Sequence, residues 1–317
     1  MQTLRALDAC PHPPQGTAVT IGAYDGVHRG HRTVISTVQR LAHERGLATA
    51  VVTFDRHPAS VVRPESAPRL LTDLDQKLEL LEDSGVDYTL VVHFDEERSQ
   101  ESAEHFVREV LVDCLNAKLV VVGADFHFGH QRRGNVPLLQ QMGRELGFEV
   151  LGMSLVGPDG EPARDEMQVS STAIRRALVA GDLATANAML GHEYEVRGVV
   201  QHGDKRGREW GFPTANIAIP EDILLPKDGV YAGWYERPSG ERVASAMSLG
   251  RRPQVYEAQP YRLLEVHLLD WEGDLYDEVA KVRFVARLRD EAKFESDEAL
   301  LAQMRGDCDE ARRLLGD

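Results

Sequence analysis

The feature that most constrains the fold is a short apolar run that passes through a glycine-rich turn into an amphipathic helix. Residues 18–21 form a mainly apolar run that predicts a buried strand, and Gly22 and Gly26 bracket a tight turn directly after it. From Gly30 onward apolar residues recur every three or four positions, and Gly46 stands where such a helix would end. This order of elements predicts a strand–helix unit of an α/β fold.

Two histidines lie where this strand passes into this helix. His28 and His31 are three residues apart, at a helix N-terminus whose unpaired backbone N–H groups favour anions. Glycine allows a phosphate to approach the backbone closely, so we expect the turn to bind a nucleotide. The residues expected to do so are Gly22, Asp25, Gly26 and Gly30. The alternative is a pair of surface histidines on an ordinary strand–helix loop.

The rest of the first half alternates strand and helix patterns. Strands are predicted at 48–54, 89–92, 119–122 and 148–151, and helices around 73–81, 106–115 and 138–146. Apolar strands separated by helices are typical of a parallel sheet covered on both faces. Ligands in such folds bind at the carboxyl ends of the strands.

Two further segments follow predicted strands. Phe54 and His57 come at the end of one strand, and Asp125, Phe126 and Phe128 follow another inside a glycine-flanked turn. The phenylalanine pair can stack on a flat ring, and a carboxylate can accept hydrogen bonds from a base or ribose. For the phenylalanines, packing in the core is the alternative. Asp125, between glycines and close to arginines, favours a functional role.

Residues 170–175 combine a helix start with a second potential anion site. Ser170, Ser171 and Thr172 precede a helical pattern and are typical N-terminal caps. Their hydroxyls, the free N–H groups and Arg175 one turn later suit the phosphates of a nucleotide. A simple helix cap is the alternative.

The pattern changes after residue 190. Short strand-like runs separated by turns are expected at 194–200, 214–219, 229–236, 242–249, 263–269 and 279–285. They predict an antiparallel sandwich or barrel, followed by a helix at 297–315. We therefore expect an α/β fold with a doubly wound parallel-sheet domain at 1–187 and a β-barrel domain at 188–317.

A glycine-rich basic segment enters the second of these runs. Gly203, Lys205 and Gly207 can cradle phosphates through backbone N–H groups and charge. Thr214 and Asn216 alternate onto one strand face, where a hydroxyl and an amide oxygen suit Mg²⁺ beside a nucleotide. A polar hairpin loop is the alternative.

One strand-like run in the second half carries a carboxylate. Glu265 and His267 share a face of the run 263–269. A carboxylate in an otherwise apolar strand needs a reason, because burying an unpaired charge is costly. Glu265 is a candidate general base, or alternatively an exposed member of an edge strand.

Composition narrows the function classes. The 317 residues carry a net charge of −15, which argues against a nucleic-acid partner. Cys10, Cys114 and Cys308 are odd in number and far apart, so we expect no disulfide framework and no metal cluster. We also expect neither a secretory signal nor a membrane span, and hence a cytoplasmic protein.

Taken together, the motifs resemble those of the prokaryotic bifunctional riboflavin kinase and FMN adenylyltransferase family, the FAD synthetases. The resemblance is carried by the segments 22–31, 53–58, 123–129, 170–175, 211–216, 229–232, 264–270 and 288–294. It extends over essentially the whole chain. Tyr24, Trp210 and Asp277 depart from the usual family pattern, as does the stretch 247–254.

The resemblance implies two reactions. The second domain would phosphorylate riboflavin with ATP, with Glu265 accepting the hydroxyl proton and Thr214 and Asn216 holding Mg²⁺. The first would join FMN to the AMP part of ATP, giving FAD and pyrophosphate, with His28 and His31 stabilising the developing charge. The flavin-binding residues implied are Phe54, His57, Phe126, Phe128, Arg289 and Phe294.

Two other functions remain as alternatives. One is a nucleotidyltransferase for a different phosphorylated acceptor, with the barrel as a recognition domain. The other is a non-catalytic flavin-binding or regulatory protein. The expected partners are the small molecules riboflavin, FMN and ATP, and the sequence leaves the oligomeric state open.

Overall fold

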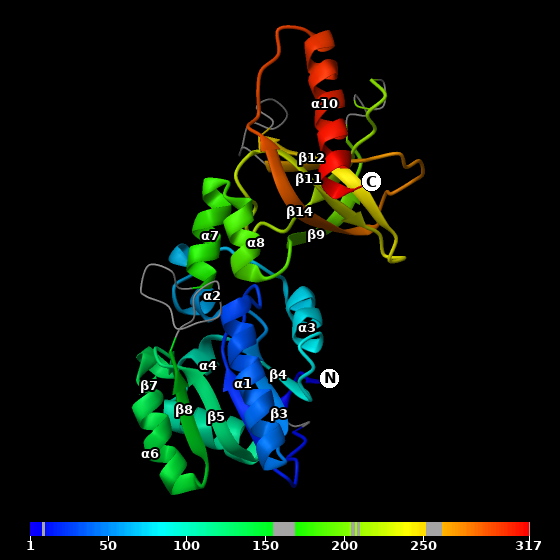
Figure 1. Ribbon diagram of the computed structural model, residues 1–317. Helices are drawn as coiled ribbons and strands as arrows, with labels where there is room; N and C mark the ends of the chain where they lie inside the picture. The colour runs from blue at the N-terminus through cyan, green and yellow to red at the C-terminus, as the bar shows by residue number, and fades with distance from the viewer. Residues whose placement is uncertain (8–9, 155–168, 204–206, 208–209, 252–261, 317) are drawn as a thin grey trace. The chain divides into compact units, whose positions relative to one another are not determined.

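The computed structural model describes residues 1–317 except 8–9, 155–168, 204–206, 208–209, 252–261 and 317. The chain forms two compact units, Met1–Ser171 and Thr172–Asp317 (Figure 1). The predicted boundary after residue 187 differs from this division and stays a prediction. Within the described residues, no helix is both long and apolar enough to cross a membrane.

The first unit is built on a parallel sheet, as predicted, and this sheet has six strands, one more than the sequence pattern indicated. Its strands, in spatial order, are β1 (Gln2–Leu4), β4 (Tyr88–Val92), β3 (Ala48–Phe54), β2 (Thr17–Ile21), β5 (Ala117–Gly123) and β8 (Glu149–Met153). From β2 the chain first adds β3 and β4 on one side and then β5 and β8 on the other. The strand order therefore reverses between β2 and β5, which is where open α/β sheets bind ligands.

Helices cover both faces of this sheet because its central strands are apolar on both sides. They are α1 (Arg29–Arg45), α2 (Pro58–Val62), α3 (Leu74–Glu82), α4 (Glu96–Ser99), α5 (Ala103–Phe106), the π-helix η3 (Val107–Cys114) and α6 (Val136–Leu146). Val19 of β2 packs in one core with Val110 and Leu139, whereas the adjacent Ala18 packs in another with Val38 of α1. This alternation fixes the sheet between two helical layers.

Three local features differ from the sequence prediction or were missed by it. Strand β1 is only three residues long and carries too little pattern to be recognised. The short pair β6 (His127–Phe128) and β7 (Gly134–Asn135) follows β5. The helix predicted over 106–115 is largely the π-helix η3, since apolar spacing does not distinguish a π-helix from an α-helix.

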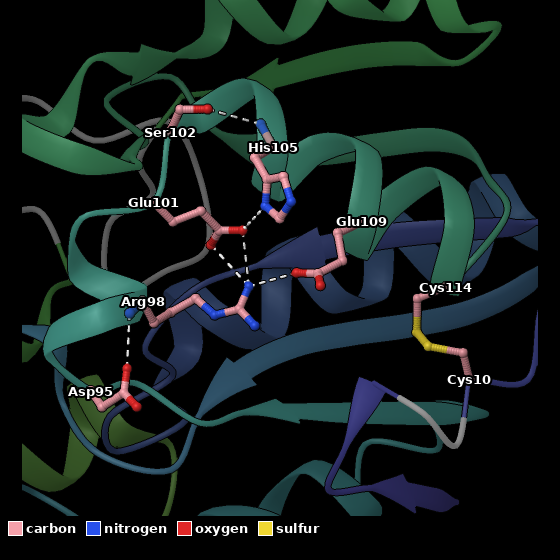
Figure 2. A network of polar contacts seen from close by, with 8 residues as sticks. All are labelled: Cys10, Asp95, Arg98, Glu101, Ser102, His105, Glu109 and Cys114. Carbon is pink, nitrogen blue, oxygen red and sulfur yellow. Dashed lines mark hydrogen bonds and ion pairs between the residues drawn. A yellow bond between two sulfur atoms is a disulfide. The ribbon is translucent and has the colours of Figure 1, made fainter.

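Cys10 and Cys114 form a disulfide (Figure 2), so the prediction of no disulfide is wrong for this pair. The cysteines are 104 residues apart, and their Cα atoms lie 4.8 Å apart. They precede β2 and β5, which are parallel neighbours, so the segments that enter the two strands meet at the same end of the sheet. This pairing follows from strand order, which cysteine spacing does not reveal. Cys308 is free and buried.

Replacing Cys10 with serine should lower the free energy of unfolding of the oxidised protein by about 2–4 kcal/mol, because a long cross-linked loop restricts the unfolded chain. Chemical denaturation with and without reductant measures this effect. Reduced wild type and reduced variant should unfold at nearly the same denaturant concentration, and Cys308→Ser is the matched control. Finding all three thiols free in air-equilibrated wild type would contradict the disulfide.

The second unit contains a closed antiparallel barrel followed by a helix, as predicted. Two helices that precede the barrel also belong to this unit. The barrel strands, in spatial order, are β10 (Ala215–Ala218), β13 (Arg262–Leu268), β12 (Arg242–Arg251), β11 (Gly229–Glu236), β14 (Val279–Arg289) and β9 (Tyr194–Gln201). Among the described residues of this unit, the large aromatic side chains that are fully buried are those of Tyr194, Tyr231, Tyr235 and Phe284. Closure removes the exposed edges that an open sheet would present.

Two helices of the second unit, one before and one after the barrel, pack on the barrel strands. The helical pattern predicted after residue 172 is divided at Gly181 into α7 (Ser171–Ala180) and α8 (Leu183–Leu190). Asn187 of α8 donates to the Phe284 carbonyl and accepts from the Tyr194 N–H, both at 2.9 Å. The C-terminal α10 (Asp297–Leu315) lies against β11 and β12 (Figure 1), where alanines on the strands allow close approach.

Candidate active sites

His28 and His31 form a stacked pair at the start of α1. Their ring centroids are 3.6 Å apart with planes inclined by 15°. His28 is the N-cap of the helix, and its Nδ1 accepts a hydrogen bond from the His31 N–H at 3.3 Å. An imidazole that accepts at Nδ1 carries its N–H at Nε2 when neutral. The pair follows β2 at the start of a helix, as predicted, and the structure shows that the strand order reverses at this point.

The surroundings of His31 keep its ring neutral. Burial, the facing His28 ring and the charge of Lys77 together lower the pKa of His31 well below its usual value. Its other ring neighbour is Tyr24, at 4.8 Å, whose hydroxyl donates to Thr20. The Nδ1 atom of His31 is buried and has no hydrogen-bond partner in the described part of the protein.

The glycine turn before the histidines is held by a buried carboxylate. Asp25 Oδ1 accepts from the Leu71 N–H at 2.8 Å and from the Thr72 N–H at 3.2 Å, and the Gly26 N–H donates to Thr72 Oγ1. The Asp25 carbonyl accepts from Ser171 Oγ at 2.9 Å. The Asp25 carboxylate therefore organises the turn. Nucleotide binding by Asp25 stays a prediction.

Two glycines of the turn lie where a side chain has little room. A Cβ on Gly30 would lie 3.2 Å from the His28 ring and 3.3 Å from the Val169 carbonyl oxygen, and one on Gly22 would lie 3.2 Å from the Tyr24 ring. The backbone at Gly30 therefore lies close to the His28 ring, and the backbone at Gly22 lies close to the Tyr24 ring. Among the other predicted phosphate ligands, Ser170 and Ser171 belong to the first unit, whereas Thr172 and Arg175 lie in α7 and group with the second.

The predicted flavin-binding residues of the first unit lie at the ends of β3 and β5. Phe126 and Phe128 stack at 5.3 Å, remain half-buried and pack against the main core. Phe54 is also half-buried and meets Phe94 edge to face at 5.4 Å. His57 caps α2, with its Nδ1 accepting from the Ala59 N–H. The phenylalanines thus combine core packing with exposed ring surface.

Asp125 lies beside this aromatic pair. Its side chain is exposed, and a Cβ on Gly123 would lie only 2.9 Å from Asp125 Oδ1. An exposed carboxylate at the carboxyl end of a central strand has the geometry expected for ribose or base contacts. Its nucleotide-binding role stays a prediction.

Lys77 was missed by the sequence analysis. It lies on the buried face of α3, and its Nζ donates to the Phe54 carbonyl at 2.6 Å and to the Ala23 carbonyl at 3.4 Å. The available signal was a lysine among Leu74, Leu78 and Leu81, where helical spacing calls for an apolar residue. Such a residue needs polar partners, which here come from both predicted ligand-binding strand ends.

In the barrel, Asn216 lies opposite Glu265 in the antiparallel pair β10–β13. Both side chains belong to the outward-facing, half-buried set of their strands. Thr214 lies just before β10, two residues from Asn216, and is likewise half-buried. Asn216 Oδ1 is buried without a hydrogen-bond partner among the described residues, which suits an oxygen ligand for Mg²⁺.

Gly203 and Gly207 of the predicted phosphate segment lie directly against these residues. A Cβ on Gly203 would lie 1.9 Å from Asn216 Nδ2. One on Gly207 would lie 2.3 Å from the Phe212 carbonyl oxygen and 3.6 Å from Thr214 Oγ1. Only glycine allows this approach, so the predicted phosphate loop and the predicted metal ligands are brought together. Lys205 lies outside the described residues.

Near Glu265 lies a second carboxylate that the sequence analysis missed. Glu291 approaches Gly250 so closely that a Cβ there would lie 1.7 Å from its Oε1. Burial first, and then the charge of Asp228, raise the pKa of Glu291, and Glu265 contributes in the same direction. His267 shares the face of Glu265, as predicted, and its Nδ1 lies 2.7 Å from the Pro213 carbonyl oxygen.

The remaining predicted flavin ligands lie beside α10. Arg289 forms a two-pronged ion pair with Asp307, with Nε–Oδ1 at 3.0 Å and Nη2–Oδ2 at 2.7 Å. Its guanidinium carbon lies 5.7 Å from the centre of the Phe294 ring. The ion pair fixes the arginine against the helix. Flavin contact by Arg289 and Phe294 stays a prediction.

A separate polar cluster lies on α5 and η3 (Figure 2). Glu101, His105 and Glu109 bring one ligand atom each within 4.8 Å of one another. Arg98 Nη1, however, lies 2.9 Å from Glu101 and 2.7 Å from Glu109, and His105 Nδ1 lies 2.6 Å from Glu101. The guanidinium already supplies the cation for both carboxylates, so this is a closed ion-pair network.

The fold and these two sites define a class of two-module enzyme, with a nucleotidyltransferase-like α/β unit and a flavin-kinase-type barrel. Residues 10–173 match the family model described as FAD synthetase, and residues 190–315 match the model described as riboflavin kinase. The chain belongs to the family of bifunctional riboflavin kinase/FMN adenylyltransferases.

Known relatives are similar in sequence over nearly the whole length of this chain. The enzyme of this name from Escherichia coli K12 is 38% identical over 100% of this chain and 98% of its own. That from Listeria monocytogenes is 39% identical over 93% and 91%. A solved structure from Streptococcus pneumoniae, named as a macrolide-efflux protein, is 26% identical over 98% of both chains, with a TM-score of 0.84.

Proposed function

We propose that the protein makes FAD from riboflavin in two steps, one in each unit. The observation that carries the proposal is the stacked pair His28–His31 at the reversal point of the sheet, within the span that matches the FAD synthetase model. The pairing of Asn216 with Glu265, within the span that matches the riboflavin kinase model, supports the other step.

In the barrel, Glu265 accepts the proton of the ribityl 5′-hydroxyl of riboflavin as that oxygen attacks the γ-phosphorus of ATP, giving FMN and ADP. Thr214 and Asn216 hold Mg²⁺, which neutralises charge on the phosphates when bound. The oxygen of Asn216, which has no partner among the described residues, and the close approach of Gly203 to this side chain and of Gly207 to Thr214 support this assignment. Such transfer depends mainly on positioning and charge.

In the α/β unit, the FMN phosphate attacks the α-phosphorus of a second ATP, and pyrophosphate leaves. His28 and His31 donate hydrogen bonds to the phosphoryl oxygens where charge develops, together with the N-terminus of α1. Ser170 and Ser171, the predicted phosphate ligands that belong to this unit, bind the leaving pyrophosphate. No covalent enzyme intermediate is needed.

The remaining assignments concern binding and location. The aromatic residues Phe126 and Phe128 stack on a flat ring of the substrates, and Asp125 accepts hydrogen bonds from the nucleotide. The partners are riboflavin, FMN and ATP, with Mg²⁺ as cofactor, and the net charge of −15 disfavours nucleic acid. We place the protein in the cytoplasm, where these substrates are available.

Chromatography of products formed from riboflavin, ATP and Mg²⁺ over time tests the proposal. FMN should accumulate first and FAD should follow. A chelator should stop both steps, and excess Mg²⁺ should restore them. Tight flavin binding without either product would favour a non-catalytic flavin-binding protein, and FMN formation without FAD would favour another acceptor for the α/β unit.

A further inference from the structure

A buried lysine joins the two strand ends that frame the histidine pair. Lys77 is 7% exposed, yet its Nζ reaches the Phe54 carbonyl at 2.6 Å and the Ala23 carbonyl at 3.4 Å. Ala23 belongs to the glycine turn after β2, and Phe54 ends β3. A single ammonium group from α3 therefore bridges two segments, the turn that precedes the histidines and the end of β3 at Phe54.

Charged groups around Lys77 influence whether its ammonium group keeps its proton. The carboxylates of Asp25, in the glycine turn, and Asp55, after β3, stabilise its charged form. Burial acts more strongly in the opposite sense and lowers the pKa of Lys77 to about 8. On α1 the charge of Lys77 acts on His31, whose protonation is opposed first by burial and then by His28 and Lys77.

We infer that Lys77 is a positioning residue for adenylyl transfer, which fixes the glycine turn against the end of β3 and sets the electrostatic field at His31. The inference rests on the proposed adenylyl transfer in this unit. Lys77 acts through the Ala23 and Phe54 carbonyls and through His31. When the ammonium loses its proton, the bridge keeps at most part of its hydrogen bonding and loses its charge.

The pH dependence separates this role from a purely structural one. The kcat/KM of FMN adenylylation reports the free enzyme. It should fall as pH rises through about 8, since Lys77 then becomes neutral. In Lys77→Arg the side chain stays charged, so this basic limb should move upward by more than one pH unit. Riboflavin phosphorylation by the same protein should not show the shift.

Removing the charge should lower the rate itself. Lys77→Met keeps the length of the side chain, and we expect about a 10- to 100-fold lower kcat/KM for FAD formation, since small misplacements at a reacting centre have effects of this size. Its basic limb near pH 8 should disappear, and loss of the cation should raise the pKa of His31 and move the acid limb upward. Lys118→Met, at an exposed position of β5, is the matched control.

The outcomes decide between the two roles. A wild-type profile without a limb between pH 7 and 9 overturns the inference and needs no variant. A limb unchanged in Lys77→Arg, or turnover of folded Lys77→Met within twofold of Lys118→Met, also overturns it. If Lys77→Met does not fold, the Lys77→Arg profile decides alone. Failure of the wild type to form any FAD would instead refute the proposed function.

Discussion

Replacing His28 with alanine is expected to abolish most FAD formation while FMN still accumulates. The change removes a hydrogen-bond donor from the phosphoryl site, the stacking partner of His31 and the cap of α1. Losing one such donor typically lowers kcat by about 10²–10³-fold. Losing the cap adds about 1 kcal/mol of destabilisation, which a folded protein of this size tolerates. Chromatography of the products formed from FMN and ATP measures this loss of FAD formation.

The design contains its own controls. His43→Ala removes an exposed histidine from the last turn of the same helix and should leave FAD formation unchanged. Phosphorylation of riboflavin by His28→Ala should match the wild type, because that reaction belongs to the other unit. Normal FAD formation by His28→Ala, or loss of both reactions in a folded protein, would refute the assignment.

For the barrel we expect the opposite result, in which FMN formation is lost and FAD formation from supplied FMN is kept. Glu265→Gln should lower FMN formation from riboflavin by about 10²–10⁴-fold, the usual contribution of a positioned general base. The amide keeps the size of the side chain opposite Asn216, so the fold and the metal ligands should be little disturbed. Initial rates with riboflavin, and separately with supplied FMN, measure the effect on each step.

Glu272→Gln, in the exposed turn after β13, provides the matched control and should behave like wild type. Supplied FMN should still be converted to FAD by Glu265→Gln at the normal rate. If the glutamine variant phosphorylates riboflavin normally, Glu265 is not the base, and the neighbouring carboxylate of Glu291 becomes the candidate.

Much of the fold could be predicted because periodicity reports burial directly. The strands Ala48–Phe54 and Gly229–Glu236 and the helix Asp297–Leu315 have the predicted bounds, since each is bordered by clear turn or cap residues. The disulfide of Cys10 with Cys114 was not predictable, because it depends on β2 and β5 being neighbours. The same limit applies to β1, which gains its stability from pairing with β4.

The site was predictable where it is local in sequence. The stacked pair His28–His31 follows from three-residue spacing at a helix start. The pairing of Asn216 with Glu265 was not, because strand register joins residues far apart in the chain. Lys77 was missed for a different reason: its role depends on two carbonyl groups, and backbone atoms leave no mark on the sequence.

The central claim is that each unit performs one step and that FMN links them. Mixing the His28→Ala and Glu265→Gln proteins with riboflavin, ATP and Mg²⁺ tests it most directly. Each variant alone should yield little or no FAD, whereas the mixture should produce it, since one protein supplies FMN and the other adenylylates it. A mixture of two folded variants that forms no FAD, or rapid FAD formation from riboflavin by either alone, would contradict the claim.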